Sequence, residues 1–284
     1  RRSQGPIKVG ATRHVVNRMA ERYPPPPKDI RHTPVAADTS RGLCAAEWLS
    51  VAEPERTVLY FHGGGYFFCG LSTHRPACAY LAKSAKARVL SVDYRLAPEH
   101  VFPAAVDDAV AWWRALLSEG VRPDQVVFAG DSAGGGLALA CLVAARDQGL
   151  PMPAGAILFS PWTDLSCSGD TMQSLAKADV MFDPDSLPQA AALYLQGTPA
   201  TTPLASPLFA DLHGLPPLMI HASRHEILLA DSTRLHERAT QQGVASELHL
   251  RSRLPHVWPT MIMLPEARQS LHDCGVFAAR VTRP

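Results

Sequence analysis

The segment over residues 126–136 limits the possible folds more than any other part of this sequence. Four apolar residues, Val-Val-Phe-Ala, run directly into Gly130-Asp131-Ser132-Ala133-Gly134, and more small residues follow. The apolar run predicts a short buried strand, and the residues after the turn predict a helix over 137–148. A serine on such a turn tolerates little bulk two residues to either side, and the two glycines allow close backbone approach. The pattern favours a strained turn with a nucleophilic Ser132 beside a helix N-terminus; the alternative is a tight turn that only needs small residues.

Strand and helix patterns alternate along most of the chain. Apolar strands are expected over residues 43–51, 56–61, 88–93, 126–129, 156–160, 217–222 and 244–251. Helices are expected over residues 9–22, 75–86, 103–119, 137–148, 231–242 and 265–280. This alternation is typical of a mostly parallel sheet with helices on both faces. It stops between residues 165 and 215, where two helical pieces at 171–178 and 186–195 indicate an insertion over one end of the sheet.

The composition excludes several classes of protein. The 27 basic and 26 acidic residues leave a net charge of +1, so we expect no nucleic-acid partner and no stable membrane association. No apolar run approaches the roughly 18 residues of a membrane span, and no secretion signal is evident. The six cysteines are scattered without a Cys-x-x-Cys pair, which favours reduced thiols and a cytoplasmic location.

A run of three glycines follows another apolar strand, in His62-Gly63-Gly64-Gly65-Tyr66. Without side chains, their backbone N–H groups are free to point at one spot. Acyl transfer needs such donors, because the tetrahedral intermediate carries a negative oxygen and each donor contributes about 2.7–4 kcal/mol. A flexible loop or a phosphate cradle is the alternative, but neither Gly-Lys-Ser/Thr nor a dinucleotide-binding pattern follows.

Four motifs together resemble the bacterial hormone-sensitive-lipase-like esterases. These are His62-Gly63-Gly64-Gly65, Asp93-Tyr94-Arg95-Leu96-Ala97-Pro98-Glu99, Gly130-Asp131-Ser132-Ala133-Gly134-Gly135 and Ser160-Pro161-Trp162, in the order seen in that family, and the resemblance covers residues 40–284. It implies the α/β-hydrolase fold, an α/β architecture with a mostly parallel central sheet of about eight strands flanked by helices. It also implies that Ser132 is the nucleophile and that the backbones of Gly64, Gly65 and Ala133 form the oxyanion hole.

The family builds a small helical cap from two parts of its chain. The resemblance therefore implies an N-terminal cap segment over 1–42 and an inserted cap segment over 166–212. Residues 43–165 and 213–284 then form the catalytic core. Tyr94, Arg95 and Glu99 of the second motif are expected to support the glycine-rich loop rather than to take part in the chemistry.

The serine needs a base, and in this fold the chain order is Ser, acid, His. Seven histidines lie downstream of Ser132: His213, His221, His225, His236, His249, His256 and His272. His236 and His272 fall in expected helices, and His249 lies in an expected strand. His256 alone follows a strand within a loop, and the family carries its base in a matching Pro-His segment. We expect His256 to be the base.

The acid is expected after the strand at 217–222, where Glu226 and Asp231 are the candidates. Glu226 stands where many relatives carry Asp, and a glutamate can hold the imidazole by the same hydrogen bond. Asp231, followed by Ser232, suits the N-cap of the next helix instead. We therefore favour Glu226 as the acid.

The spacing of the histidines in the same region does not fit a metal site. His221 and His225 precede Glu226, whereas the metalloprotease pattern needs a glutamate directly after the first histidine. We therefore expect neither a metal site nor an organic cofactor.

The expected function is hydrolysis of short-chain carboxylic esters by a Ser-His-Glu triad through an acyl-enzyme intermediate. The resemblance implies acyl chains of about two to six carbons, small-molecule ester substrates, and a monomer or homodimer. An amidase or deacetylase acting on N-acyl compounds is the alternative, because the triad does not separate esters from amides. A binding protein on the same fold is a remote alternative, since such proteins lose a triad member that this chain retains.

Overall fold

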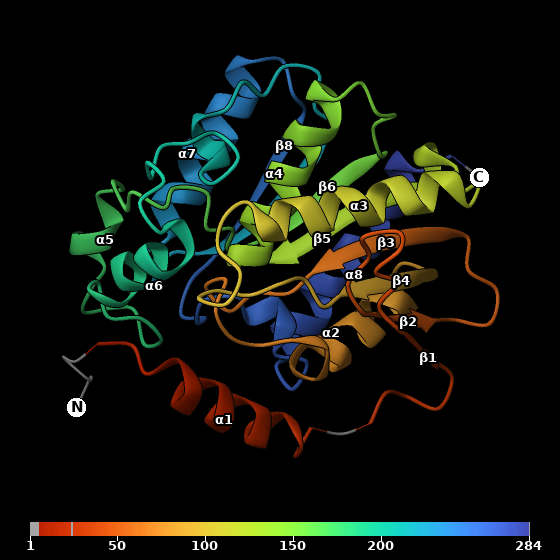
Figure 1. The fold of residues 1–284 in the computed structure, drawn as a ribbon, viewed down its shortest axis with the longest axis horizontal. Helices are drawn as coiled ribbons and strands as arrows, with labels where there is room; N and C mark the ends of the chain where they lie inside the picture. The colour runs from red at the N-terminus through yellow and green to blue at the C-terminus, as the bar shows by residue number, and fades with distance from the viewer. Residues whose placement is uncertain (1–5, 24, 284) are drawn as a thin grey trace.

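A single eight-stranded sheet runs through the computed structural model, which describes residues 6–23 and 25–283 (Figure 1). The strands stand in the order β1-β2-β4-β3-β5-β6-β7-β8. Their bounds are β1 Arg31–Val35, β2 Ala46–Ser50, β3 Arg56–Phe61, β4 Ala87–Val92, β5 Val126–Asp131, β6 Gly155–Phe159, β7 Leu218–Ser223 and β8 Ser246–Arg251. Strand β2 pairs antiparallel with β1 and β4, and the remaining neighbours are parallel. The predicted mostly parallel sheet is confirmed.

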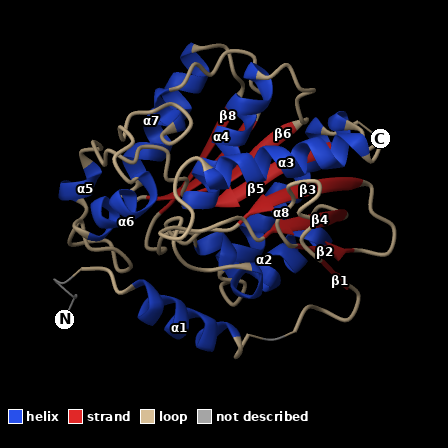
Figure 2. Ribbon diagram, in the orientation of Figure 1, coloured by secondary structure: helices blue, strands red, loops and turns tan. Residues whose placement is uncertain are grey.

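Helices cover both faces of the sheet (Figure 2). One face packs against α2 (Leu71–Ser84) and α8 (Pro265–Val281), and the other against α3 (Ala104–Ser118), α4 (Ala133–Asp147) and α7 (Leu229–Gln241). Alternate residues of β5 divide between the two layers: Val127 and Ala129 belong to the core with α2 and α8, Val126 and Phe128 to the other. Burial on both faces explains why the central strands are apolar throughout.

Strand β1 lies within residues 1–42, where no strand was predicted. It pairs with β2 at the edge of the sheet, and four of its five residues are exposed. Its sequence, Arg-His-Thr-Pro-Val, lacks the apolar alternation of a half-buried strand because an exposed edge strand buries almost nothing. Only α1 (Val9–Ala20) in this part of the chain was predicted.

Three helices begin earlier than predicted. Helix α2 starts at Leu71, so Pro76 lies inside it; Thr73 Oγ1 donates to the carbonyl of Gly70 at 2.6 Å and fixes this start. Helix α4 starts at Ala133, directly after Ser132, and α7 starts at Leu229. At all three starts the N-cap residue, Gly70, Ser132 or Leu228, makes no side-chain capping hydrogen bond, so the usual sequence signal of a helix start did not mark the right residue.

Residues 166–212, hereafter the insertion, lie on the same side of the molecule as α1 (Figure 1). They contain α5 (Thr171–Ser174), α6 (Ser186–Leu195) and a short 3-10 turn (Pro207–Phe209). Ile7, just before α1, donates its backbone N–H to Gln189 Oε1 of α6 at 3.0 Å. The two parts of the chain that were expected to form a cap are thus in contact.

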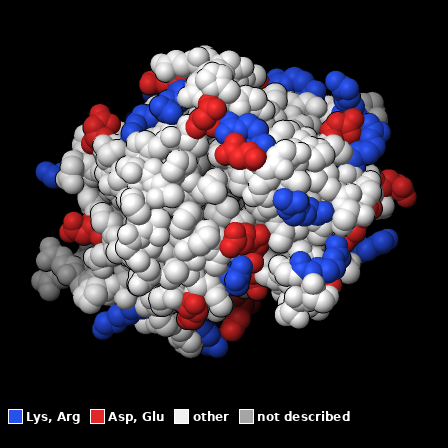
Figure 3. Space-filling model, turned by 45° about the horizontal axis from the view of Figure 1, so that its top comes forward, with Lys and Arg blue, Asp and Glu red and all other residues white. Residues whose placement is uncertain are grey.

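Charged side chains of both signs are mixed on the face seen in Figure 3, in keeping with the net charge of +1. Wide uncharged areas separate them. Within the described ranges, no helix has the length and apolar character needed to cross a membrane.

Candidate active site

Ser132 lies at the junction of β5 and α4, with φ 52° and ψ −121°. A non-glycine residue in this region stores about 1–3 kcal/mol of strain. The carbonyl of Phe159, at the end of β6, accepts the Ser132 N–H at 2.8 Å. A Cβ on Gly134 would lie 2.1 Å from the carbonyl oxygen of Phe61, and one on Gly130 would lie 2.3 Å from that of Gly134. Only glycine fits at these two positions, so the turn can close around Ser132.

The structure brings Ser132, His256 and Glu226 together from three loops. His256 Nε2 lies 2.9 Å from Ser132 Oγ, and His256 Nδ1 lies 2.8 Å from Glu226 Oε2. Both side chains of the His–Glu pair are only 1% exposed. The three residues expected to form a triad therefore make one continuous line of hydrogen bonds.

The loop after β7 and the loop after β8 are tied to each other beside this line. Ser223 donates its N–H to Glu226 Oε1 at 3.2 Å and its hydroxyl to the carbonyl of Leu254 at 2.5 Å. Arg253 donates its N–H to His225 Nδ1 at 3.2 Å. These bonds fix the acid and the histidine relative to one another, with the second carboxylate oxygen of Glu226 occupied as well.

Asp231, the other candidate acid, makes no hydrogen bond to His256 in the described part of the chain. It is also not the N-cap residue of α7. It lies in the first turn of α7, 1% exposed, where its Oδ2 accepts the N–H groups of Thr163 and Asp164 at 2.8 and 2.9 Å. Burial and the neighbouring carboxylate of Asp164 raise the pKa of Asp231 to about 7. The predicted capping role is wrong because α7 begins two residues earlier, which turns this side chain inward.

The glycine-rich loop is held by Asp131, a residue that the sequence analysis did not single out. Asp131 Oδ1 accepts the N–H of Gly63 at 3.0 Å and the hydroxyl of Tyr60 at 2.7 Å, and Oδ2 lies 3.2 Å from His74 Nε2. Burial alone would raise the pKa of Asp131, but His74 and the Tyr60 hydroxyl outweigh it and lower that pKa. The position of Asp131 next to Ser132 was a usable signal; nothing in the sequence marked His74.

Gly64 and Gly65 follow in conformations with φ +111° and +57°. A Cβ on Gly64 would lie 2.1 Å from the carbonyl oxygen of Phe68, so the loop folds back on itself there. Ala133 is the first residue of α4, and the first N–H groups of a helix have no acceptor within it. Of the three expected oxyanion donors, Gly64 and Gly65 thus lie on the loop after β3, and Ala133 lies at the start of α4, directly after Ser132.

Tyr94 of the second motif supports this loop, as expected, whereas Arg95 bonds to Asp108 of α3. The hydroxyl of Tyr94 donates to the carbonyl of His62 at 2.6 Å, and its ring stacks on the His62 imidazole at 4.3 Å. Burial and the nearby His74 lower the pKa of His62 to about 4.

Arg13 of α1 reaches the same loop and was not predicted to do so. Its guanidinium donates to the carbonyls of Phe67 and Ala97, both at 2.7 Å, and to both carboxylate oxygens of Glu99 at 2.8 Å. The hydrogen bonds from Arg13 lower the pKa of Glu99 to about 2. One arginine therefore fastens α1 to the segment that follows the glycines.

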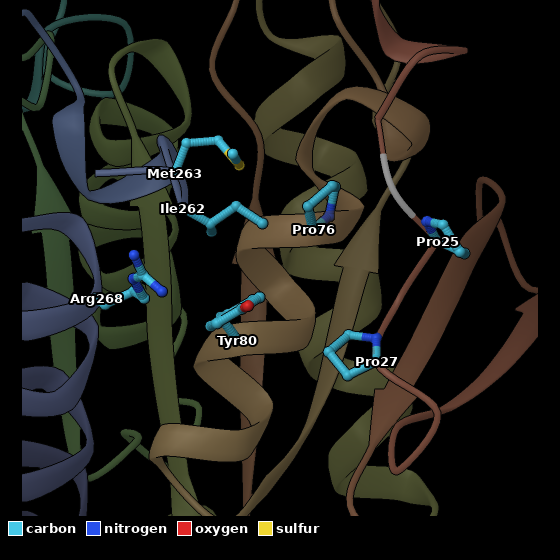
Figure 4. Close-up of a pocket in the computed structure, with 7 residues that line it drawn as sticks. All are labelled: Pro25, Pro27, Pro76, Tyr80, Ile262, Met263 and Arg268. Carbon is cyan, nitrogen blue, oxygen red and sulfur yellow. The ribbon is translucent and has the colours of Figure 1, made fainter. Parts of the chain in front are cut away.

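A separate pocket of about 190 Å³ lies between α2, the proline-rich segment before β1 and the residues before α8 (Figure 4). Its lining includes Pro27, Pro76, Tyr80 and Arg268, and it includes neither Ser132, Glu226 nor His256. It is therefore not part of the candidate site.

The histidines considered for a metal are placed apart from one another. His221 is buried and stacks on His249 at 4.8 Å, whereas His225 contacts the loop at Arg253. Burial and His249 lower the pKa of His221 to about 3. Among the described residues, no group of three His, Cys, Asp or Glu side chains could hold a metal ion.

Comparison with known proteins identifies the family. A family described by the α/β-hydrolase fold matches residues 58–260. A solved esterase of the bacterial hormone-sensitive lipase family is 38% identical, with a TM-score of 0.93 over 99% of this chain and 94% of its own. The chain belongs to the bacterial hormone-sensitive lipase family of α/β hydrolases.

Two curated relatives are named as an acetyl-hydrolase and an esterase. An acetyl-hydrolase of Streptomyces hygroscopicus is 42% identical over 85% of this chain and 81% of its own length. An esterase of Acinetobacter venetianus is 34% identical over 97% of this chain and 90% of its own.

Proposed function

We propose that this hormone-sensitive lipase family member hydrolyses short-chain carboxylic esters with Ser132 as nucleophile, His256 as general base and Glu226 as the acid. That the chain is a carboxylic ester hydrolase follows from its family and from relatives named as esterases. The observation that supports the residue roles is the line of hydrogen bonds from Ser132 Oγ through both nitrogens of His256 to Glu226, at 2.9 and 2.8 Å.

His256 Nε2 takes the proton of the Ser132 hydroxyl while Ser132 Oγ attacks the carbonyl carbon of the ester. Glu226 accepts the Nδ1–H of His256, which fixes the tautomer and stabilises the imidazolium that forms. His256 then gives the proton to the leaving alcohol. A water molecule, deprotonated by the same nitrogen, then attacks the acyl-enzyme, which releases the carboxylic acid product and restores Ser132.

The backbone N–H groups of Gly64, Gly65 and Ala133 are the proposed donors to the oxyanion. Ala133 contributes the N-terminus of α4, where partial positive charge collects. Gly63, the residue before Gly64, donates its N–H to Asp131 Oδ1, and this bond fixes the loop before substrate binds. Such preorganisation stabilises the transition state without reorganisation at the moment of reaction.

The preference for short acyl chains is proposed from the covering of the site. Tyr194 of α6 stacks on Tyr66 at 3.9 Å, with both rings buried, and so closes the space beside the glycine-rich loop. We propose that α1 and the insertion act together as a cap that limits acyl length. The name of the Streptomyces relative, an acetyl-hydrolase, supports a small acyl group.

A series of p-nitrophenyl esters, compared with aryl amides of the same acyl groups, tests the proposal. We expect the highest kcat/KM on short esters below their micelle concentrations, and little hydrolysis of the amides. Ser132→Ala should remain folded and lose about 10⁶-fold in kcat. A variant that keeps one-tenth of the activity, or highest efficiency on long chains or emulsions, would contradict the proposal.

A further inference from the structure

Asp179 lies in the insertion, in the turn between α5 and α6, and its carboxylate is almost completely buried. Asp179 is 2% exposed, whereas Val180 beside it is 80% exposed and Met181 is 44% exposed. Burying a carboxylate is costly unless hydrogen bonds replace its water. Its Oδ1 accepts the backbone N–H groups of Met181 and Phe182 at 2.8 and 2.9 Å. These bonds shape the turn itself.

The other oxygen of Asp179 reaches out of the insertion. Oδ2 accepts the backbone N–H of Ile227 at 2.8 Å, across 48 residues of sequence. Ile227 directly follows Glu226, and it is completely buried. The carboxylate therefore joins the turn of the insertion to the loop that carries the acid.

Thr171 of α5 holds the same peptide from its other side. Its hydroxyl donates to the carbonyl of Ile227 at 2.7 Å and accepts the N–H of Ala230 at 2.9 Å. Both backbone polar groups of Ile227 are thus bound by side chains of the insertion.

Phe182 connects this arrangement to the base. Its ring lies edge-on to the His256 imidazole, with centroids 4.7 Å apart and planes at 64°. Its N–H is one of the groups bound by Asp179. A single carboxylate thus fixes both the backbone next to Glu226 and the residue whose ring packs on His256.

We infer that Asp179 is a positioning residue for the acid–base pair, with Thr171 as its partner on the opposite side of the Ile227 peptide. Asp179 acts through the Ile227 peptide, which follows Glu226, and through Phe182. The inference rests on the proposed function, because it concerns the geometry of the proposed triad. A displacement of about 1 Å in such a group can cost about 100-fold in rate.

The test compares Asp179→Asn with Asp185→Asn, which changes an exposed carboxylate of the same insertion. An asparagine has one acceptor oxygen, so its NH₂ group must face either Ile227 N–H or the N–H groups of Met181 and Phe182. With p-nitrophenyl acetate we expect Asp179→Asn to lower kcat by about 10- to 100-fold with KM within about twofold. Asp185→Asn should leave both constants unchanged.

Thr171 supplies a second pair of variants should Asp179→Asn fail to fold. Thr171→Val removes the hydroxyl at constant shape and should lower kcat, whereas Thr171→Ser keeps the hydroxyl and should restore it. Unchanged kcat in both Asp179→Asn and Thr171→Val would overturn the inference. So would a fall in kcat that Thr171→Ser shares with Thr171→Val.

A double substitution separates positioning from a direct effect on substrate. Because Asp179 acts in part through Glu226, Asp179→Asn should lower kcat by a clearly smaller factor in the Glu226→Ala background than in the wild type, measured at high enzyme concentration. A full additional loss there would overturn the inference. Wild-type activity in Glu226→Ala alone would instead contradict the proposed function, so the two failures can be told apart.

Discussion

The glycine-rich loop on one side of Ser132 and the acid loop on the other are held by different parts of the chain. Asp131, Tyr60 and His74, which fix the glycine-rich loop at Gly63, belong to β5, β3 and α2 of the central layers. The acid loop is bound at Ile227 by Thr171 and Asp179 of the insertion.

This difference separates stability from activity. The Asp131 contacts join elements that form the sheet and its covering helices, so their loss should weaken the whole fold. The contacts of the insertion join two loops at the surface of that core, so their loss should alter the geometry of the reaction more than the folding equilibrium.

The largest expected effect lies on the acid side. Glu226→Ala should lower kcat by about 10⁴-fold, as loss of the acid does in other triads. Asp231→Ala should lower kcat by less than about tenfold but destabilise the fold by about 1–3 kcal/mol, because the N–H groups of Thr163 and Asp164 lose their acceptor. Steady-state kinetics and urea unfolding of both variants measure this, and a reversed order of activity losses would show that Asp231 is the acid.

At the glycine-rich loop, Asp131→Ala should lower both kcat and the free energy of unfolding. It leaves the buried Tyr60 hydroxyl, the His74 imidazole and the Gly63 N–H without their acceptor, and each buried polar group left unsatisfied costs about 1–3 kcal/mol. We expect kcat to fall by about 100-fold and stability to fall further than in Asp179→Asn. Asp131→Asn, which keeps an acceptor for Gly63, is the control. Equal stability of the Asp131→Ala and Asp179→Asn proteins would remove the contrast between the two sides.

The lowered pKa of Asp131 adds a pH dependence with a definite sign. Its ionised form is favoured by folding, so its contribution to stability is present above the unfolded pKa of about 3.9 and is lost as pH falls through the folded value. Urea unfolding of the wild type and Asp131→Asn between pH 3 and pH 6 should show the two converging in acid. A constant difference across this range would contradict the assignment.

Arg13 tests whether the glycine side also depends on a peripheral element. Arg13→Lys cannot span two carbonyls and both oxygens of Glu99, since an ammonium is a point charge without the planar fork. We expect kcat to fall by about three- to tenfold with little change in the unfolding midpoint. Arg18→Lys, on the same helix, is the matched control, and equal kinetics of the two variants would limit Arg13 to surface pairing.

The smallest expected effect concerns Asp231 and pH. Because its pKa is raised to about 7 in the folded protein, its contribution to stability is full below the unfolded pKa and is lost as pH rises through 7. Asp231→Asn removes this loss, so the variant should gain on the order of 1 kcal/mol on the wild type between pH 5 and pH 8. Parallel pH profiles of the unfolding free energy would show that Asp231 is ionised throughout.

The sequence predicted those features whose signal is local. The turn at Ser132 could be recognised because the backbone approaches so closely at positions 130 and 134 that only glycine fits there. The central strands were predicted because burial on both faces makes them apolar throughout. The expected site residues Ser132, Glu226 and His256 lie together in the structure, although their order along the chain came from the family resemblance.

The features that were missed depend on contacts between distant segments. Strand β1 buries too little to leave a pattern, and the inward turn of Asp231 follows from where α7 begins. In the sequence, Asp179 cannot be told from the other charged residues of the insertion. Only the structure shows that its Oδ2 lies 2.8 Å from the backbone nitrogen of Ile227. Polar residues that pair across the fold have no periodicity, so sequence reasoning assigns them to the surface.

The binding of both polar groups of Ile227 by the insertion has a consequence for engineering. Segments that cover an active site are the natural targets for exchange between relatives when a new substrate range is wanted. In this protein such an exchange would also replace the side chains that hold the acid loop, and a chimera could lose turnover for reasons unrelated to its new pocket. Libraries that randomise the insertion should therefore keep Thr171, Asp179 and Phe182, and vary α6, which faces the glycine-rich loop through Tyr194.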